Sequence, residues 1–177
     1  MRHFIMDTET TGLIKNSLQP LKHQPRVIEF YARIDNDAGE LLEEIEFFCD
    51  PGVPVSAEIT KITGIKPEDV KGQPAFSHFS PRIKEMIESC DVCVAHNLSF
   101  DMAIVDMDMS RSKVEFDWPA TKLCTVEGSE HLKGHRLNLS ALHELLFGEP
   151  FAGAHRARTD VEALARCYHE LVARGEI

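Results

Sequence analysis

The order of its apolar segments constrains the fold of this chain more than any other feature. Apolar runs at residues 4–6, 27–34 and 41–49 predict three strands, and the turn-rich residues 35–39 separate the last two. Apolar residues spaced by three and four then predict helices over about 74–89 and 100–107, with a short buried strand at 92–95 between them. The last third is mostly helical, with a stop at Gly148 and a final apolar stripe from Val161 to Val172. A meander followed by alternating helices and strands predicts an α/β fold with helices on the faces of a mixed central sheet.

Length and charge narrow the classes of protein further. The chain has 177 residues, and we expect residues 1–177 to form a single domain. Its 29 acidic residues outnumber its 19 Lys and Arg residues, which gives a formal charge of −10. Proteins that wrap duplex nucleic acid usually carry a basic footprint, so this balance argues against such a protein.

The sequence predicts neither a membrane protein nor a secreted one. No apolar run approaches the ~18 residues of a membrane span, and Asp7 and Glu9 interrupt the amino terminus before a signal-peptide core could form. Five cysteines are an odd number for a disulfide framework, so we expect a reducing cytoplasm. Cys90 and Cys93 form a C-x-x-C pattern near His96, but we expect them to be small apolar residues entering a buried strand.

Two carboxylates follow the first predicted strand. Asp7 and Glu9 are spaced at i and i+2, so both side chains should point to the same face of the sheet. Carboxylates aimed together at a strand end repel each other unless a cation lies between them. A polar junction between strand and turn is the simpler interpretation of such a pair, and only further acids in suitable places would favour a metal site.

Asp101 is one such acid. It follows the buried strand at 92–95, so it should lie at a strand's carboxyl end or in the first turn of the next helix. Ligands collect at that edge of open α/β sheets. The alternative is that Asn97 or Ser99 caps the helix and Asp101 complements its dipole, which is compatible with catalysis.

His155 and Asp160 form the last candidate pair. On one continuous helix a spacing of five places two side chains roughly 140° apart, so they share a site only if the helix begins between them. A capping box formed by Thr159 and Glu162 predicts a start near Thr159, and a start around Ala157 would serve as well. The alternative for His155 is an ordinary loop histidine.

These segments, in this order, resemble the DEDD exonuclease superfamily. The resemblance rests on Asp7-Thr-Glu-Thr-Thr-Gly, Ile62-Thr-Gly-Ile, His96-Asn-Leu-Ser-Phe-Asp and His155-Arg-Ala-Arg-Thr-Asp, and it covers residues 4–171. The chain is similar to the histidine-bearing (DEDDh) branch, which includes the proofreading epsilon subunit of bacterial DNA polymerase III and stand-alone bacterial and phage relatives. The resemblance implies an RNase H-like fold and a 3′–5′ exonuclease that releases nucleoside 5′-monophosphates from single-stranded or frayed DNA.

The resemblance also implies roles for the acids and the histidine. Asp7, Glu9, Asp101 and Asp160 would hold two divalent cations, and oxygen ligands of this kind suit Mg²⁺ or Mn²⁺. His155 would be the general base, because its ordinary pKa near 6.5 suits proton abstraction at neutral pH.

Substrate contacts are implied in the same way, with three groups of residues. One group approaches the terminal nucleotide, one packs against its base, and one shapes the wall of the site. The three groups are Thr8, Thr10 and Thr11; Leu13, Ile62, Gly64 and Ile65; and His96, Asn97 and Phe100. For Phe100, an ordinary place in the helix core is an equally good interpretation.

Several alternatives stay open at this point. DNA is favoured as the substrate, but a 3′–5′ exoribonuclease of the RNase T or oligoribonuclease type fits the same residues. A non-catalytic nucleic-acid or polymerase interaction module is a third alternative, although all four acids and the histidine are present. A polymerase is a candidate partner, and we expect no carboxyl-terminal docking tail like that of the epsilon subunit.

The segment between Gly12 and Arg26 is longer than its counterpart in many members of the superfamily. It carries Lys15, Lys22 and His23, and it must begin beside the catalytic strand. One hypothesis is that it contacts the nucleic-acid strand upstream of the terminus, and the alternative is a structural loop. A second basic stretch, with Lys122, Lys133, His135 and Arg136, is a candidate for the same role.

Overall fold

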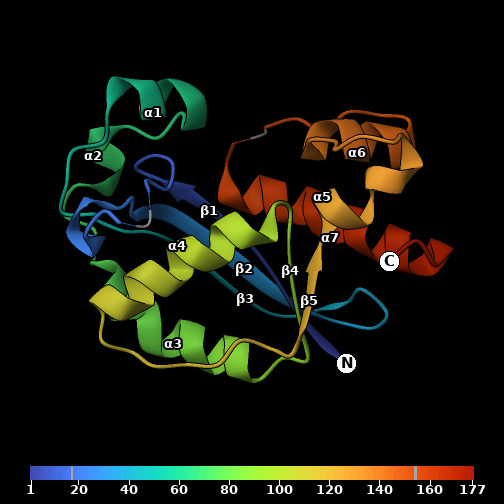
Figure 1. The fold of residues 1–177 in the computed structure, drawn as a ribbon, viewed down its shortest axis with the longest axis horizontal. Coiled ribbons are helices and arrows are strands. Elements are labelled where there is room, and N and C mark those ends of the chain that lie inside the picture. Colours follow the sequence, from blue (N-terminus) through green and yellow to red (C-terminus); the bar gives the residue numbers. More distant parts are fainter. Residues whose placement is uncertain (17, 154) are drawn as a thin grey trace.

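The computed structural model describes residues 1–16, 18–153 and 155–177. The strands are β1 (Arg2–Thr10), β2 (Val27–Asn36), β3 (Leu41–Phe48), β4 (Val92–Ala95) and β5 (Thr121–Cys124). The α-helices are α1 (Ala57–Thr63), α2 (Pro67–Val70), α3 (Phe76–Glu88), α4 (Leu98–Arg111), α5 (Thr125–Gly128), α6 (Leu139–Phe147) and α7 (Ala157–Arg174). Two 3-10 turns complete the elements, η1 (Leu21–His23) and η2 (Glu130–Leu132) (Figure 1).

The five strands form one mixed sheet in the order β3-β2-β1-β4-β5. The first three strands pair antiparallel as the predicted meander, while β4 and β5 pair parallel to β1 and to each other. The central strand β1 therefore has an antiparallel neighbour on one side and a parallel neighbour on the other. This arrangement confirms the predicted α/β class and the mixed central sheet.

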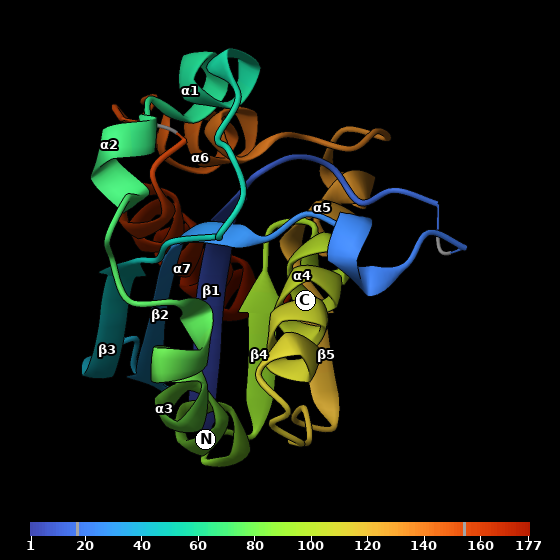
Figure 2. The same cartoon turned by 90° about the vertical axis from the view of Figure 1, so that its left-hand side faces the viewer.

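Helices cover both faces of the sheet, and Figure 2 shows α3 and α4 in front of the strands with α7 behind them. Alternate residues of β1 pack to opposite sides: Phe4 and Met6 join the apolar cluster of α3 and α4, and Ile5 joins that of α7. Helix α6 packs on α7 through a third apolar cluster. None of the helices in the described part of the chain has the length and apolar character needed to cross a membrane.

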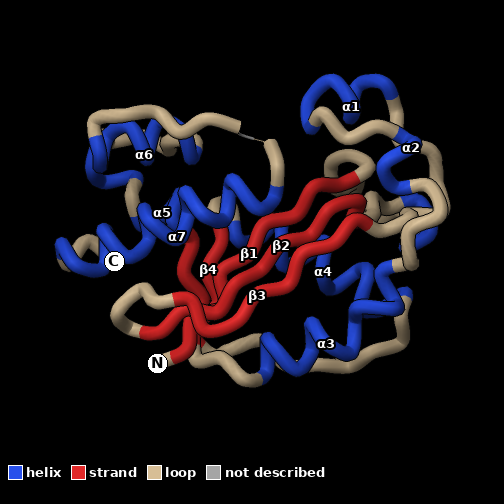
Figure 3. The backbone as a smooth tube through the Cα atoms, turned by 180° about the vertical axis from the view of Figure 1, so that it is seen from behind, coloured by secondary structure: helices blue, strands red, loops and turns tan. Residues whose placement is uncertain are grey.

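Most predicted elements are confirmed, and the exceptions have physical causes. Strand β1 runs on to Thr10, so Asp7 and Glu9 lie within it, because pairing with β2 continues through Glu9 opposite Glu29. Strand β5 was not predicted, since this edge strand is short and half exposed. Helices α1 and α2, of seven and four residues, also lack a long apolar stripe. Figure 3 shows both beside the end of the sheet at which β1 finishes.

The cysteines have the expected structural character. Cys93 is fully buried in β4, and burial raises the pKa of its thiol. All five cysteines are free thiols.

Candidate active site at the end of the central strand

Asp7 and Glu9 project from the last third of β1. They alternate with Thr8 and share the side of Ile5, which is the face that α7 covers. Both carboxylates are half-buried. The predicted common face is therefore confirmed, and it points toward the amino-terminal end of α7.

Asp101 reaches the same strand end from the opposite face. It lies in the first turn of α4 and is 3% exposed. Its Oδ1 accepts hydrogen bonds from the Thr8 backbone N–H (3.1 Å) and the Thr8 hydroxyl (2.8 Å), so β1 itself fixes this carboxylate. Asn97 is the N-cap residue by position, but its side chain makes no capping bond, and its φ of 76° is a left-handed conformation that asparagine tolerates. The alternative interpretation, in which the side chain of Asn97 caps the helix, is therefore wrong.

His155 and Asp160 lie at the beginning of α7. The helix begins at Ala157, which confirms the earlier of the two predicted starts, and its N-cap residue Arg156 makes no side-chain capping bond. The His155 backbone N–H instead donates to Asp160 Oδ2 at 2.9 Å, with His155 in a left-handed conformation (φ 70°). Glu9, His155 and Asp160 each offer a ligand atom within 4.8 Å of the other two.

An ion pair between the exposed Arg156 and the buried Glu29 fixes the turn that carries His155, and the sequence did not predict it. Glu29 on β2 lies opposite Glu9 in the strand register and is 1% exposed. Its carboxylate accepts from Arg156 Nε and Nη2, at 2.8 Å for the shortest contact, and from the Ala157 backbone N–H at 3.1 Å. The available signal was an acidic residue inside the otherwise apolar start of β2, since a charge there must find a partner.

The pKa of each of the four acids is raised, by burial first and, for Asp7 and Glu9, also by the charges of the other acids. Burial raises the pKa of Asp7 well above its ordinary value, and the charges of Asp101, Glu9 and Asp160 raise it further. Burial, then the charge of Asp160, raises the pKa of Glu9 to about 8. Burial also raises the pKa of Asp101 and Asp160, against the opposing hydrogen bonds that each accepts. The negative charge of these four carboxylates is therefore not balanced by positive side chains nearby.

A cavity of about 250 Å³ opens beside these acids. Its lining includes catalytic candidates from β1 and α7 together with the start of α6: Asp7, His96, Asn138, Leu139, Ser140, Phe151, His155 and Asp160. The Nδ1 atom of His96 lies 2.9 Å from the Thr125 hydroxyl, and burial lowers the pKa of His96 to about 4. His96 is thus a neutral wall residue at physiological pH.

The donor set fits divalent cations. Four carboxylates converge, and the nearby guanidinium of Arg156 is already bonded to Glu29. Clustered carboxylate oxygens are the ligands that hard cations such as Mg²⁺ and Mn²⁺ prefer. A cation would also relieve the mutual repulsion that raises the pKa values.

The three threonines predicted to approach the substrate have internal partners for their hydroxyls. Thr8 donates to Asp101, and Thr10 donates to the Gly12 carbonyl at 2.7 Å. The Thr11 hydroxyl accepts from the Arg26 backbone N–H at 3.0 Å. These side chains organise the strand end and the following turn, and their contacts with a substrate stay a prediction.

The apolar residues predicted to pack against a base divide into exposed and covered side chains. Leu13 is 81% exposed and Ile62 is 52% exposed, so both present apolar surface. Ile65 is 2% exposed, and Gly64 ends α1 in a left-handed conformation. Ile65 packs with Ile28, Val55 and Val70, which leaves its side chain covered. Phe100 is half-buried against the apolar cluster of α3 and α4, as its alternative interpretation predicts.

Comparisons with known proteins agree with this geometry. The RNase_T family, described as exonucleases, matches residues 4–168. The PolC-type DNA polymerase III of Listeria monocytogenes is 32% identical over 173 residues, and that of Clostridium perfringens is 30% identical over 166 residues. These matches cover 95% and 92% of this chain but 11% of each polymerase, so the chain spans about a tenth of the length of these relatives.

Solved structures share the fold. Exonuclease I superposes with a TM-score of 0.78 at 18% identity, over 97% of this chain and 41% of its own. Exonuclease X in complex with 5′ overhanging duplex DNA gives 0.70 at 21% identity, over 98% and 93%. The nuclease domain of 3′hExo, a DEDDh family member, bound to rAMP, gives 0.77 at 15% identity, over 98% and 92%. Together with the family match and the convergent acids, these likenesses establish that the chain belongs to the DEDD 3′–5′ exonuclease superfamily and has its RNase H-like fold.

Proposed function

We propose that this protein is a metal-dependent 3′–5′ exonuclease that removes nucleoside 5′-monophosphates from single-stranded or frayed DNA. One observation carries the proposal. Four carboxylates from one strand and two helices converge beside His155, at the end of the central strand of an exonuclease-family fold. They belong to Asp7 and Glu9 on β1, Asp101 on α4 and Asp160 on α7. A non-catalytic binding module would have no need to keep this mutually repelling set of acids.

Two divalent cations, Mg²⁺ or Mn²⁺, would be held by these four carboxylates. Such a pair supplies charge stabilisation at the attacking and leaving oxygens of phosphodiester hydrolysis. Two of the acids are held by hydrogen bonds, Asp101 from Thr8 and Asp160 from the His155 backbone N–H. The site therefore has its shape before any substrate arrives, which is the preorganisation that electrostatic catalysis requires.

His155 is the proposed general base. Its side chain is exposed at the cavity, and one of its ring nitrogens lies within 4.8 Å of carboxylate oxygens of Glu9 and Asp160. Their negative charge would stabilise the imidazolium that forms when His155 accepts a proton. The turn that carries it is anchored by the Glu29–Arg156 pair, so the ring is held near the acids although it lies outside a regular element.

DNA is the proposed substrate, and frayed or single-stranded ends are the proposed form. The PolC-type relatives are DNA polymerases, and exonuclease X was solved with DNA. The exposed side chains of Leu13 and Ile62 support contacts with the terminal base, because apolar packing on a base face tolerates every sequence. RNA is the second candidate, because the DEDDh neighbour 3′hExo was solved with rAMP. A polymerase is the proposed protein partner, by the same likeness to PolC-type enzymes.

The experiment compares 5′-labelled and 3′-labelled single strands of DNA and RNA of the same sequence, each with Mg²⁺, Mn²⁺ or EDTA. We expect a ladder from the 5′-labelled DNA, immediate release of label from the 3′-labelled DNA, and neither product in EDTA. Faster degradation of RNA than of DNA would show that RNA is the preferred substrate. Metal-independent cleavage, or intact polymers in every arm, would refute the proposed activity.

A further inference from the structure

The connection between β1 and β2 is much longer than its geometry requires. The two strands are antiparallel neighbours, and such neighbours are usually joined by two to five residues. Here the connection occupies residues 11–26. Connections of this length within a compact domain usually have a function of their own.

This connection is also the longest part of the chain without an acidic residue. Between Glu9 and Glu29 there is none, while Lys15, Lys22, His23 and Arg26 are present. In a protein of net charge −10, the lysines here form a local positive region next to an acidic site. Lys15 and Lys22 are both exposed.

Polar side chains hold the segment in place. Gln24 is 8% exposed, and its amide accepts from the Lys15 backbone N–H at 3.0 Å and donates to the Asn16 carbonyl at 3.1 Å. Arg111, at the end of α4, donates to the backbone carbonyls of Leu21 (2.6 Å), Gln24 (3.1 Å) and Pro25 (3.0 Å). Hydrogen bonds from Gln24 and Arg111 therefore hold the segment in a defined conformation, without a small apolar core of its own.

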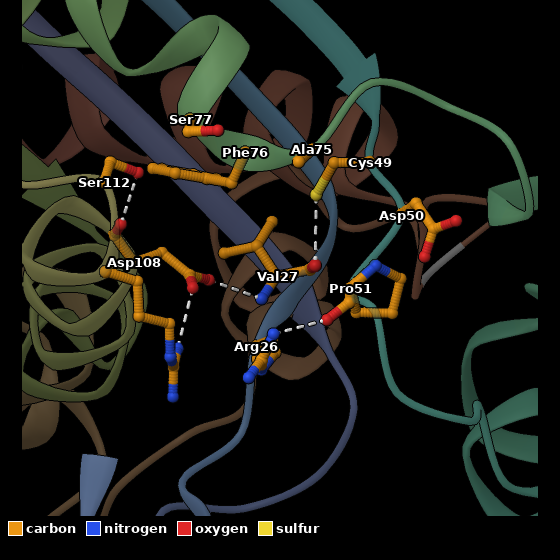
Figure 4. A pocket seen from close by; sticks show the side chains of 11 residues that line it. Arg26, Val27, Cys49, Asp50, Pro51, Ala75, Phe76, Ser77, Asp108 and Ser112 are labelled. Atoms are coloured by element: carbon orange, nitrogen blue, oxygen red, sulfur yellow. Dashed lines mark hydrogen bonds and ion pairs between the residues drawn. The ribbon is translucent and has the colours of Figure 1, made fainter. Parts of the chain in front are cut away.

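The region where the segment rejoins the sheet is equally well tied. Figure 4 shows the small cavity there, of about 110 Å³, between the start of β2 and α4. Asp108 accepts from the Val27 backbone N–H at 2.8 Å, and Arg26 Nη1 donates to the Pro51 carbonyl at 2.7 Å. Because Asp108 and Arg111 belong to the helix that carries Asp101, one helix positions both the acid and the segment.

Apolar side chains point outward from this polar framework. Leu18 is 89% exposed, and Ile14 and Leu21 are 36% and 39% exposed. Single exposed leucines are common, but several on one short loop form a surface that a partner would cover. Figure 2 shows the segment projecting to the side of α4, away from the strands.

We propose that residues 13–16 and 18–24 form a contact surface for single-stranded nucleic acid beyond its terminal nucleotide, with Lys15 and Lys22 on phosphates and Leu18 on a base. A polyanion fits because the lysines lie in a stretch without acidic residues that starts directly after Glu9. Alternating positive and apolar side chains are what non-specific binding of single strands uses. The proposal rests on the proposed exonuclease function, since that function places a 3′ end at the acids.

The test removes the two charges with Lys15→Gln and Lys22→Gln in one variant. The matched control is Arg82→Gln with Lys84→Gln on α3, whose side chains are 51% and 40% exposed. Arg82 pairs with Glu43, which also pairs with Arg2 at the opposite end of β1 from the acids. Binding of a fluorescein-labelled 20-nucleotide DNA is measured by anisotropy over a salt series, in an Asp7→Asn background that keeps the DNA intact. Turnover of the 20-mer and of a dinucleotide is measured without that substitution.

We expect the lysine variant to bind the 20-mer about tenfold more weakly, with a log–log salt slope shallower by about 1.4 for two lost phosphate contacts. Its KM should rise on the 20-mer while kcat/KM for the dinucleotide stays within twofold of the parent. Leu18→Ser should weaken binding of the 20-mer without changing the salt dependence of that binding. Binding and slope equal to those of the α3 control would overturn the proposal, as would an equal loss on both substrate lengths.

The two failures are distinguishable. If the parent chain degrades DNA and the lysine variant matches the α3 control, the surface is wrong and the exonuclease stands. If no chain degrades any polymer but the lysine variant still loses binding, the surface stands and the proposed activity is wrong.

Discussion

The acidic site has two halves that are built differently. On one side, Asp101 is 3% exposed and is fixed by two hydrogen bonds from Thr8 on the central strand. On the other side, His155 is exposed on a left-handed turn and is tied by its backbone to Asp160. The first half is fixed by regular elements, while the second depends on a short turn and on the Glu29–Arg156 ion pair beneath it. The comparison indicates that the central strand fixes the buried carboxylate Asp101, whereas a short turn places the exposed imidazole of His155.

Asp7 lies between the halves, and its substitution should have the largest effect. The charges of Asp101, Glu9 and Asp160 all act on it, so Asp7→Asn removes the carboxylate that links the two sides. We expect exonuclease turnover to fall below detection. The melting temperature of the metal-free protein should rise at neutral pH, because folding no longer has to bury an ionisable carboxyl among other acids. Turnover is measured on labelled single-stranded DNA, and melting by circular dichroism.

If the Asp7→Asn variant degrades DNA at a rate close to that of the parent, Asp7 is not a ligand of the catalytic metal. Asp91→Asn is the matched control, because Asp91 is exposed and lies before β4 at the opposite end of β1, where it accepts from the Arg2 backbone N–H. That variant should keep full turnover.

The substitution His155→Gln tests the exposed half of the site, and its effect on turnover should be the second largest. Loss of a general base typically costs about 10²–10⁴-fold in rate. We expect kcat to fall within that range while Mg²⁺ still stabilises the protein against heat, since the carboxylates remain. His78→Gln, at an exposed histidine on α3, is the control and should be silent. If metal stabilisation vanishes along with turnover, His155 is a metal ligand and the division between the halves is wrong.

The two halves also differ in how far the sequence alone predicts them. The common face of Asp7 and Glu9 follows from the two-residue period of a strand, and the place of Asp101 follows from the strand at 92–95 before it. For His155 the sequence predicted only a conditional result. The spacing of five residues lets His155 and Asp160 share a site only if the helix begins between them. The structure decides for Ala157, since Glu29 and Arg156 hold the turn and no capping box forms.

Other features depend on long-range partners that no local pattern contains. The hydroxyl of Thr8 is bonded to Asp101, 93 positions away, and Glu29 is bonded to Arg156, 127 positions away. Ile65 is covered by residues of β2 and α2, although its neighbours in the sequence are exposed. Periodicity predicts elements and faces, but the partner of a given polar atom is settled by tertiary packing.

The pair beneath the turn gives a smaller effect that separates the halves directly. Glu29→Gln keeps the shape of the side chain but removes the charge that binds Arg156 and the Ala157 N–H. Substitution of a residue that orients a metal ligand typically costs about 10–100-fold in activity, and we expect a loss in that range. Amide hydrogen exchange should become faster at residues 155–160.

Thr8→Val is the matched change on the buried half, because it removes one hydrogen bond to Asp101 and leaves a side chain of similar size. We expect a comparable loss of activity with unchanged exchange at residues 155–160. Faster exchange there in Thr8→Val, or unchanged exchange in Glu29→Gln, would show that the two halves are not held independently.

The smallest effect is the pH dependence of stability without metal. Burial and the negative charge of neighbouring acids raise the pKa of Asp7, and that of Glu9 to about 8, while burial with the charge of Glu29 raises that of Asp160. The folded protein therefore keeps protons that the unfolded chain has lost. The stability of the fold therefore falls as pH rises from about 4.3, the ordinary pKa of glutamate, toward 8. Exposed carboxyls with lowered pKa values, such as Asp50, titrate below this window and do not change the sign. Half-buried His96, whose pKa is lowered to about 4, opposes this fall below about 6.5, the ordinary pKa of histidine, and has no effect on it above that pH.

We expect the melting temperature in EDTA to drop by several degrees between pH 6.5 and 8.5. Mg²⁺ should restore more of that loss at pH 8.5 than at 6.5, because cations bind the ionised acids. Asp7→Asn should flatten the EDTA profile, and a melting temperature that rises across this window would mean that the acids are not mutually destabilised.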